Sequence, residues 1–467
     1  MSGVSGGAGA VQSAGPAAFA ALLDRIFAIA RSGSTIRTEV IAGLTTFLAA
    51  SYVIVVNPAI IADAGVPFSA GVTATVLVSF ISSCAMGLYA RSPILVAPGM
   101  GINALFTYTI VLGGHVPLPV ALGCTFLAGL IFTVLAFFDL RSLLIAAIPD
   151  ALKYGVACGI GLFLALLGLI NAKFVVTDPT TIVGIGRFDP VILTFLAGLL
   201  LTMAFVIRKV PGALMAGVIA TTLLAIPIGR WYGDGSAYSA GADKVATLVN
   251  WTGLFAAPDF SFIGRIDILG ACRLGYLPLI FVLVYTNFIE ALSTFLALAE
   301  AGALKDADGL PRYMTQSMHV DAISSLISAP LGTSPATAYL ESAAGIAQGG
   351  RTGLVAVICG LLFLPFLFLS PLLSLVPSIA TAPALVMVGV FMIECIGKID
   401  WRDLEEALPG FLAILLIPLS YSITLGISLA FIAYVLLKLI NGKARKVPPA
   451  LWVTAALSVA LIVQLKL

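Results

Sequence analysis

The sequence predicts an all-α protein that crosses a membrane many times, and three observations lead to this fold class. Of its 467 residues, 60% are hydrophobic and only 10% are charged, whereas soluble domains carry about 25% charged residues. Apolar runs of about 20 residues recur along nearly the whole chain, and each could cross the hydrocarbon core of a bilayer as a helix. Two interrupted segments, 92–103 and 329–341, lie at matching places in the two halves.

Apolar runs and polar breaks divide the chain. Residues 1–35 open with a Gly/Ala/Ser-rich stretch that lacks the features of a secretory signal, so we expect a disordered cytoplasmic tail. The polar stretch 230–274 separates two halves, 36–229 and 275–447, and a further apolar helix is expected at 448–467. The expected spans lie near 36–62, 69–89, 92–112, 117–138, 150–171, 189–207, 211–229, 275–300, 317–329, 331–349, 351–370, 382–397 and within 408–440.

The run 408–440 predicts two short spans, because Pro418 and Gly426 in its middle favour a break. Lys and Arg concentrate in short cytoplasmic loops of membrane proteins. Splitting this run places the basic cluster at 438–446 on the same side as the other basic loops. The total is then fourteen spans, seven on each side of an extracytoplasmic loop, and an odd number per half makes the second repeat inverted relative to the first.

The third span of each half begins with an interruption. Residues 92–103 read SPILVAPGMGIN and residues 329–341 read APLGTSPATAYLE. Each combines a short extended-looking piece, a break rich in Pro and small residues, and a helical run. Paired interruptions are typical of a transporter binding site near the midplane, where half-helix N-termini present free backbone N–H groups. Gly and Pro could instead let helices pack closely, but the pairing favours a binding site.

Two carboxylates lie deep in apolar runs. Glu290 stands within FVLVYTNFIEALSTFLALA, and Glu341 follows the second interruption. A carboxylate at a helix centre costs about 2.5–3.5 kcal/mol, so such groups usually face a cavity or a partner. Since the spans contain no deep Lys or Arg, a proton, a cation or N–H donors of a ligand would have to meet the charge. The alternative is a permanently protonated carboxyl that bonds a neighbouring helix.

Polar and aromatic residues surround these carboxylates in the sequence. Asn287 shares a helical face with Glu290, and Asn103 follows the first interruption. Helix–helix hydrogen bonding explains any one of the polar residues as well as ligand contact does, and single aromatic residues are more often part of a core. The other candidate ligand contacts are Thr333, Ser334, Tyr339 and Phe106.

Other function classes find no support. The chain has no P-loop, nucleophile elbow or HExxH motif, so no enzyme is predicted. Its six cysteines are scattered singly, which argues against a metal site or a disulfide framework, and we expect no cofactor other than protons. The net charge of +2 with basic residues confined to short loops does not support nucleic-acid binding. The expected partners are a lipid bilayer and a small molecule, and a homodimer is one arrangement consistent with the sequence.

Several long stretches resemble a known family, the azaguanine-type purine permeases of the nucleobase/ascorbate permease superfamily. The resemblance covers about residues 36–455. The stretches that carry it are EVIAGLTTFLAASYVIVVNPAIIADAGVP (39–67), LVAPGMGINALFTYTIV (95–111), IGLFLALLGLINA (160–172), LGTSPATAYLESAAGIAQGGRTGL (331–354) and SLVPSIATAPALVMVGVFM (374–392).

The resemblance implies a fold and an activity. The implied fold has two inverted seven-helix repeats, a core domain that moves against a gate domain in an elevator-like way, and short strands before the half-helices of the third and tenth spans. The implied activity is import of the purine bases hypoxanthine, guanine and adenine with protons across a bacterial inner membrane. Other nucleobases such as uracil or xanthine, or an anion, are alternatives on the same fold. A channel-like or structural membrane protein is an alternative of another class.

The resemblance also implies residue roles. Asn103 matches the polar position of the third span, Glu290 the second acidic position of the eighth-span motif, and Glu341 the acidic position of the tenth span. The family usually has Asp where this chain has Asn287, and a shorter acid where Glu290 stands. We expect Glu341 and Glu290 to hold the base and to take part in proton coupling, with Glu290 favoured as the proton carrier.

Overall fold

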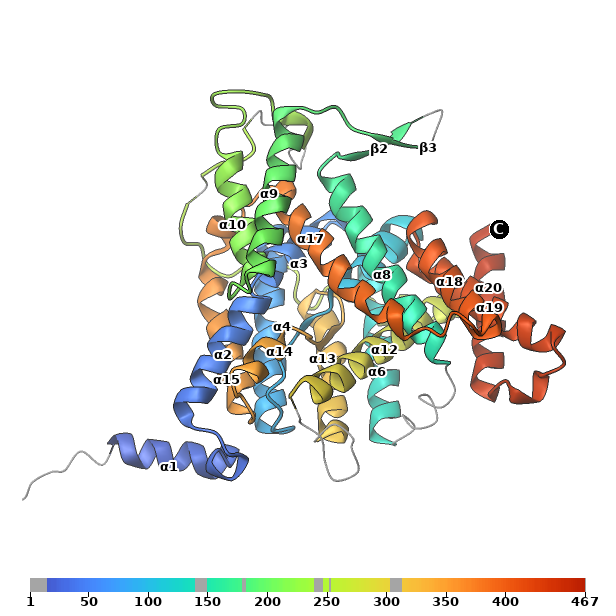
Figure 1. Ribbon diagram of the computed structural model, residues 1–467, viewed down its shortest axis with the longest axis horizontal. Helices are drawn as coiled ribbons and strands as arrows, with labels where there is room; N and C mark the ends of the chain where they lie inside the picture. The colour runs from blue at the N-terminus through green and yellow to red at the C-terminus, as the bar shows by residue number, and fades with distance from the viewer. Residues whose placement is uncertain are drawn as a thin grey trace, which may run out of the picture.

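The computed structural model describes residues 15–138, 149–178, 182–238, 247–251, 253–302 and 313–466, and its fold is almost entirely helical (Figure 1). Within these ranges, eight helical stretches are long and apolar enough to cross a membrane. Three shorter apolar helical stretches, Met100–Gly113, Ala213–Ala225 and Leu354–Phe368, accompany them. The fold is therefore that of a polytopic membrane protein.

Helices and short strands occur in both halves of the chain. The first half contains α1 (Gly15–Phe27), α2 (Ile36–Ala50), α3 (Val53–Asp63), α4 (Phe68–Leu88), β1 (Val96–Pro98), α5 (Met100–Ala104), the π-helix η2 (Leu105–Gly113), α6 (Leu118–Phe137), α8 (Asp150–Asn171), β2 (Val175–Asp178), β3 (Ile182–Ile185), α9 (Pro190–Ile207) and α10 (Ala213–Ala225). The second half contains α11 (Ile268–Ala271), α12 (Leu277–Gly302), α13 (Met314–Leu331), β4 (Ala336–Ala338), α14 (Ser342–Ala347), α15 (Leu354–Phe363), α16 (Ser370–Leu373), α17 (Ser378–Ile393), α18 (Leu404–Leu419), α19 (Ile423–Ile440) and α20 (Pro449–Lys466). Short 3₁₀ turns are η1 (Ala30–Ser32), η3 (Ser236–Tyr238), η4 (Leu274–Tyr276), η5 (Leu364–Phe368), η6 (Glu394–Lys398) and η7 (Ala444–Lys446).

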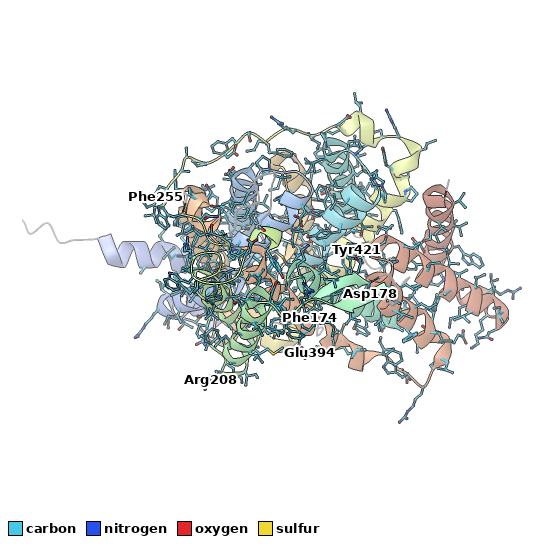
Figure 2. The ribbon with its side chains drawn as sticks, turned by 90° about the horizontal axis from the view of Figure 1, so that it is seen from above. Phe174, Asp178, Arg208, Phe255, Glu394 and Tyr421 are labelled. Carbon is cyan, nitrogen blue, oxygen red and sulfur yellow. The ribbon has the colours of Figure 1, made fainter. Side chains whose placement is uncertain are left out.

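The helices pack into two groups. The strand group consists of α2 to α6 and α12 to α15, and within it α4, α12 and α13 make the main contacts with β1 and β4. The flanking group consists of α8 to α10 and α17 to α20, in which α8 packs mainly against α17 and α18. Seen from above, α18, α19 and α20 project from one side of the molecule and α1 from the other (Figure 2). Each group draws helices from both halves of the chain.

Glycines on α8 allow its close contact with two partner helices. A Cβ at Gly155 would lie 2.5 Å from the carbonyl oxygen of Gly410 in α18. A Cβ at Gly161 would lie 2.9 Å from the carbonyl oxygen of Gly389 in α17. Small residues at helix interfaces let membrane helices approach closely, so these positions explain why α8 is the central helix of the flanking group.

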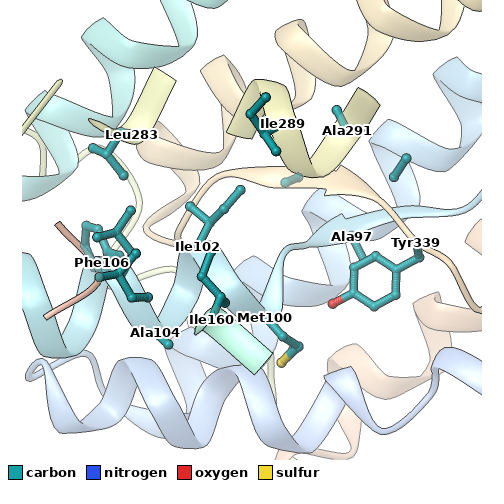
Figure 3. Packing of buried hydrophobic residues seen from close by; sticks show 14 of the residues in the cluster. Ala97, Met100, Ile102, Ala104, Phe106, Ile160, Leu283, Ile289, Ala291 and Tyr339 are labelled. Carbon is teal, nitrogen blue, oxygen red and sulfur yellow. The ribbon is translucent and has the colours of Figure 1, made fainter. Parts of the chain in front are cut away.

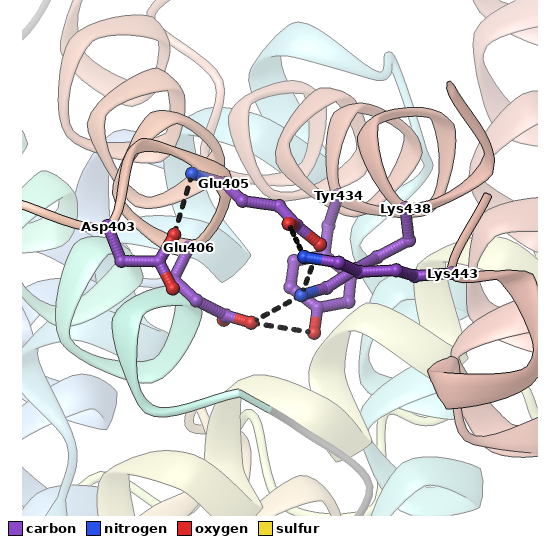
Figure 4. Close-up of polar contacts among 6 residues, drawn as sticks. All are labelled: Asp403, Glu405, Glu406, Tyr434, Lys438 and Lys443. Atoms are coloured by element: carbon purple, nitrogen blue, oxygen red, sulfur yellow. Dashed lines mark hydrogen bonds and ion pairs between the residues drawn. The ribbon is translucent and has the colours of Figure 1, made fainter. Parts of the chain in front are cut away.

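The break expected within 408–440 is present at residues 420–422, between α18 and α19. These two helices run antiparallel, and ion pairs join their open ends (Figure 4). The Nζ atom of Lys438 lies 2.6 Å from Glu405 and 2.7 Å from Glu406, and Lys443 pairs with Glu405 at 2.5 Å. Because Lys438 is buried, with 7% of its surface exposed, its charge depends on these partners.

Two expectations need comment. The disordered tail expected at 1–35 is wrong for Gly15–Phe27, which forms α1; its apolar residues Leu23 and Phe27 pack against the start of α15, and this contact stabilises the helix. Residues 1–14 lie outside the described residues. A helix, α20, covers most of the expected C-terminal apolar segment.

Candidate functional site

The two interrupted segments meet in the strand group. Strand β1 pairs antiparallel with β4, in the register Val96↔Ala338, Ala97↔Thr337 and Pro98↔Ala336. Each strand is followed by a half-helix, β1 by α5 and β4 by α14. Both strands are fully buried. The chain therefore brings two helix starts, more than 200 residues apart in sequence, to one place.

Side chains of α13 fix the backbone of β4. Asp321 Oδ1 accepts a hydrogen bond from the backbone N–H of Ala338 at 2.8 Å. Ser325 donates to the carbonyl oxygen of Ala336 at 2.7 Å, and Ser328 accepts from the N–H of the same residue at 3.2 Å. The three side chains are spaced four and three residues apart, so they share one face of the helix. These side chains satisfy backbone groups of β4 that a second neighbouring strand would satisfy in a larger sheet.

Strand β1 is fixed in a similar way from α4. Ser83 accepts from the N–H of Val96 at 3.2 Å and donates to its carbonyl oxygen at 3.0 Å. Ser342, the first residue of α14, accepts from the N–H of Leu95 at 3.0 Å. Buried backbone groups need such partners, and here the second half-helix supplies one of them to the first strand.

Glu341 lies at the N-terminal end of α14 and is half-buried. Its Oε1 accepts a hydrogen bond from the hydroxyl of Tyr52 at 2.7 Å. Tyr52, 1% exposed, occupies the short irregular turn between α2 and α3. The first span therefore contributes a phenol group to the place where the two half-helices start.

Glu290, in the middle of α12, lies against the start of α5. A Cβ at Gly99 would be 3.4 Å from its Oε1, and one at Gly101 would be 3.3 Å from its Oε2. The carboxylate therefore lies directly beside the backbone of the first turn of α5. The first amide groups of a helix have no acceptor within the helix and form its positive end, which favours a carboxylate. Glu290 Oε2 is buried and has no hydrogen-bond partner among the described residues.

Apolar side chains surround these groups (Figure 3). Ala97 and Tyr339 come from the strand pair and its continuation, Met100 from α5 and Ile289 from α12. The Tyr339 hydroxyl donates to the carbonyl oxygen of Pro98, so it joins the two interrupted segments. Phe106 has no exposed surface, and its ring would have to move before it could stack on a ligand.

Three of the remaining predicted residues, Asn103, Asn287 and Thr333, make buried hydrogen bonds next to the half-helices. The Asn57 amide donates to Thr333 at 3.2 Å, and the Asn103 amide donates to the carbonyl oxygen of Asn57 at 3.4 Å. Asn287 donates to Ser325, the residue that holds β4. The buried Oδ1 atoms of Asn57, Asn103 and Asn287 and the Oγ of Ser334 lack hydrogen-bond partners within the described part of the chain.

Sequence reasoning missed three residues of this region. Tyr52 stands alone in an apolar run, so no pattern distinguishes it. Asn57, which precedes Pro58 in an apolar run, links the first, third and tenth spans. Asp321 is fully buried, and its spacing to Ser325 and Ser328 is the signal that could have identified it.

The family model named Xan_ur_permease, described as Permease family, matches residues 37–442. The adenine permease AdeP of Escherichia coli K12 is 37% identical over 445 residues, covering 95% of this chain and 96% of the relative. The guanine/hypoxanthine permease PbuO of Bacillus subtilis is 37% identical over 437 residues, covering 92% and 98%. The nucleobase transporter PlAzg2 of Paenibacillus larvae is 36% identical over 403 residues, covering 86% and 77%. The chain belongs to the azaguanine-type purine permeases.

Solved structures with a similar fold are more distant in sequence. The transmembrane domain of the cyanobacterial bicarbonate transporter BicA superposes on the permease with a TM-score of 0.61 at 17% identity, covering 84% of this chain and 97% of that one. The SLC26A9 structure gives a TM-score of 0.62 at 12% identity, covering 91% and 69%. At this identity, the similarity concerns the fold alone.

The permease is a transporter and not an enzyme, and its candidate site has a defined chemical character. One carboxylate, Glu341, lies at the start of α14, and the other, Glu290, lies against the start of α5. Within the described ranges neither forms an ion pair with Lys or Arg. The described residues contain no cluster of three or more His, Cys, Asp or Glu that could hold a metal ion. Such a site is suited to a ligand that offers several N–H donors.

Proposed function

We propose that this permease imports purine nucleobases, namely hypoxanthine, guanine and adenine, by proton symport. The observation that carries the proposal is the convergence of Glu341 and Glu290 on the starts of α14 and α5. The ring N–H and exocyclic amino groups of a purine are donors that a carboxylate accepts. Its ring carbonyl and ring nitrogens are acceptors for the free amides of a half-helix.

The charge of the site supports proton coupling. Two carboxylates without a basic partner repel each other in an apolar surrounding, and a bound proton relieves that repulsion. Glu290 is the proposed proton carrier because its Oε2 is buried without a partner, whereas Glu341 is held by Tyr52. An anion is a poor substrate for the same reason, since the described site offers it negative groups.

An elevator-like movement of the strand group against the flanking group is the proposed mechanism, with the strand group as core and the flanking group as gate. In support of it, the site lies at the boundary between the groups. A Cβ at Gly101 would be 2.9 Å from Ile160 of α8, and Tyr285 of α12 packs edge-on against Phe431 of α19 with centroids 4.8 Å apart. The proposal includes fourteen spans in two inverted repeats, a cytoplasmic N-terminus in a bacterial inner membrane, and a homodimer as the assembly.

Uptake of radiolabelled hypoxanthine into cells that lack their own purine permeases tests the proposal. We expect substrate-specific uptake that a protonophore abolishes. Unlabelled guanine and adenine should compete, and uracil and bicarbonate should not. Absence of specific uptake would refute the purine proposal, and uptake that resists the protonophore would refute proton coupling while leaving the substrate class intact.

A further inference from the structure

Helix α1 carries an exposed apolar pair that the rest of the described chain does not cover. Leu22 is 51% exposed and Ile26 is 40% exposed. They are four residues apart and therefore neighbours on one face of the helix. Leu23 and Phe27 lie on the adjoining face and pack against the protein. Leu22 and Ile26 therefore form an exposed apolar strip beside the face of α1 that packs on the protein.

The position of α1 is fixed by the segment that follows it. Phe27 and Ile29 are buried together with Leu354, and Ile36 packs on the same cluster. Ile36 is the first residue of α2 and Leu354 the first of α15. The C-terminal end of α1 therefore lies level with the ends of two apolar helices, at the boundary of the membrane-spanning region.

The connection between α1 and α2 is tight. Asp24 Oδ1 accepts a hydrogen bond from the N–H of Ala30 at 2.7 Å. Ala28 and Gly33 both have positive φ, at 53° and 70°, and they turn the chain sharply. As a result α1 lies across the direction of α2 and α15 (Figure 1). This direction, at the end of the long apolar helices, is the geometry of a helix that lies in the plane of a membrane interface.

The exposed charges near α1 are mostly basic and are complementary to an anionic surface. Arg25 lies between Leu22 and Ile26 in the sequence, Arg31 and Arg37 follow α1 in η1 and α2, and all three are exposed. The neighbouring acid, Asp24, is half-buried and is engaged by the backbone N–H of Ala30. An amphipathic helix with apolar and basic faces binds in the headgroup region of a bilayer, and its affinity rises with the anionic lipid content.

We propose that α1 is an interfacial helix that inserts Leu22 and Ile26 into the headgroup region beside α2, with anionic phospholipid as its partner. Because α1 packs on α2 and α15, it attaches the strand group, and not the flanking group, to the membrane surface. The proposal rests on α1 alone and does not depend on the transported substrate.

Hydrogen exchange of the full-length protein in lipid nanodiscs tests this assignment. The amides of α1 should exchange most slowly in nanodiscs that contain phosphatidylglycerol, faster in phosphatidylcholine alone, and fastest in detergent. The double variant Leu22→Asp/Ile26→Asp should accelerate exchange in α1 by about tenfold, since it removes two apolar contacts. The matched control Ala21→Asp adds a charge at an exposed position off the apolar face and should leave exchange nearly unchanged.

The variant Arg25→Gln/Arg31→Gln should remove the effect of phosphatidylglycerol while keeping the difference between lipid and detergent. Peptides from α12 serve as the internal control for folding. Equal exchange of α1 in lipid and detergent would overturn the proposal, as would equal effects of the Asp variants. Protection that rises with protein concentration in detergent would instead identify a second copy of the chain as the partner and would also overturn it.

Discussion

The segment around β1 and the segment around β4 are built alike but carry different polar groups. Each has a short strand, a half-helix and a bracing helix, α4 for β1 and α13 for β4. The first segment is neutral, with Ser83 as its brace and Asn103 in its half-helix. The second has carboxylates in both places, Asp321 and Glu341. The two segments share a strand, a half-helix and a bracing helix, and they differ in their polar groups.

This difference assigns separate tasks to the two halves. The three carboxylates next to the strand pair, Glu290, Asp321 and Glu341, all come from the second half. The first half contributes a helix start without side chains at Gly99 and Gly101, against which Glu290 lies. In the proposed mechanism, the second half therefore carries charge and proton, and the first half supplies backbone amides.

Removal of the charge at Glu341 should have the largest effect. Glu341→Gln keeps the size of the side chain but weakens its acceptance of N–H donors. We expect a loss of about 3 kcal/mol in purine binding, more than a hundredfold in uptake. Asn103→Ala, in the first segment, should cost only about 1 kcal/mol.

Radiolabelled uptake at equal expression measures the Glu341→Gln effect. The control is Glu394→Gln, which changes an exposed carboxylate of η6 and should leave uptake unchanged. Normal uptake by Glu341→Gln would contradict the proposal that carboxylates of the second half hold the substrate.

Loss of the hydrogen bond between Asp321 and the β4 backbone should have the second-largest effect, a loss of stability. Asp321→Ala leaves the buried N–H of Ala338 without its acceptor, and we expect a loss of about 2 kcal/mol in stability. Asp321→Asn retains an acceptor oxygen and should recover most of this loss. Thermal unfolding of the purified protein in detergent measures both variants. If Asp321→Asn were as unstable as Asp321→Ala, the carboxyl group would have a role other than accepting that hydrogen bond.

The sequence predicted the parts of the site that follow from the cost of burial. Glu290 and Glu341 stand out in the sequence because a carboxylate within an apolar run is costly to bury. The paired interruptions stand out because Pro and Gly break otherwise continuous apolar runs. Residues that cost little when buried gave no such signal. Tyr52 is mostly apolar, and nothing in the sequence indicates that the Asn287 amide donates to Ser325. Which helices pack into which group depends on contacts between distant residues, so no local pattern indicates it.

Removal of the Tyr52 hydroxyl should have a moderate effect on substrate binding, because it acts only on Glu341 in the segment around β4. Tyr52→Phe removes the donor to Glu341 Oε1 and frees the carboxylate to adopt other rotamers. We expect an increase in the KM for hypoxanthine of about tenfold, or about 1.4 kcal/mol, with an unchanged maximal rate. The control is Tyr285→Phe, since the Tyr285 hydroxyl is buried and has no partner among the described residues. A lower maximal rate with an unchanged KM would show that Tyr52 acts on the transport movement and not on the site.

The smallest effect should come from the brace of the neutral segment. Ser83→Ala removes two hydrogen bonds to Val96, but both join uncharged groups, and β1 keeps its pairing with β4. We expect a loss of about 1 kcal/mol in stability. The neighbouring serine of α4, Ser82, is also buried, and its hydroxyl has no partner in the described part of the chain, so Ser82→Ala should be nearly neutral. If Ser83→Ala destabilised the protein as much as Asp321→Ala, the two strands would be braced equally, and the carboxyl of Asp321 would add nothing that a serine hydroxyl does not supply.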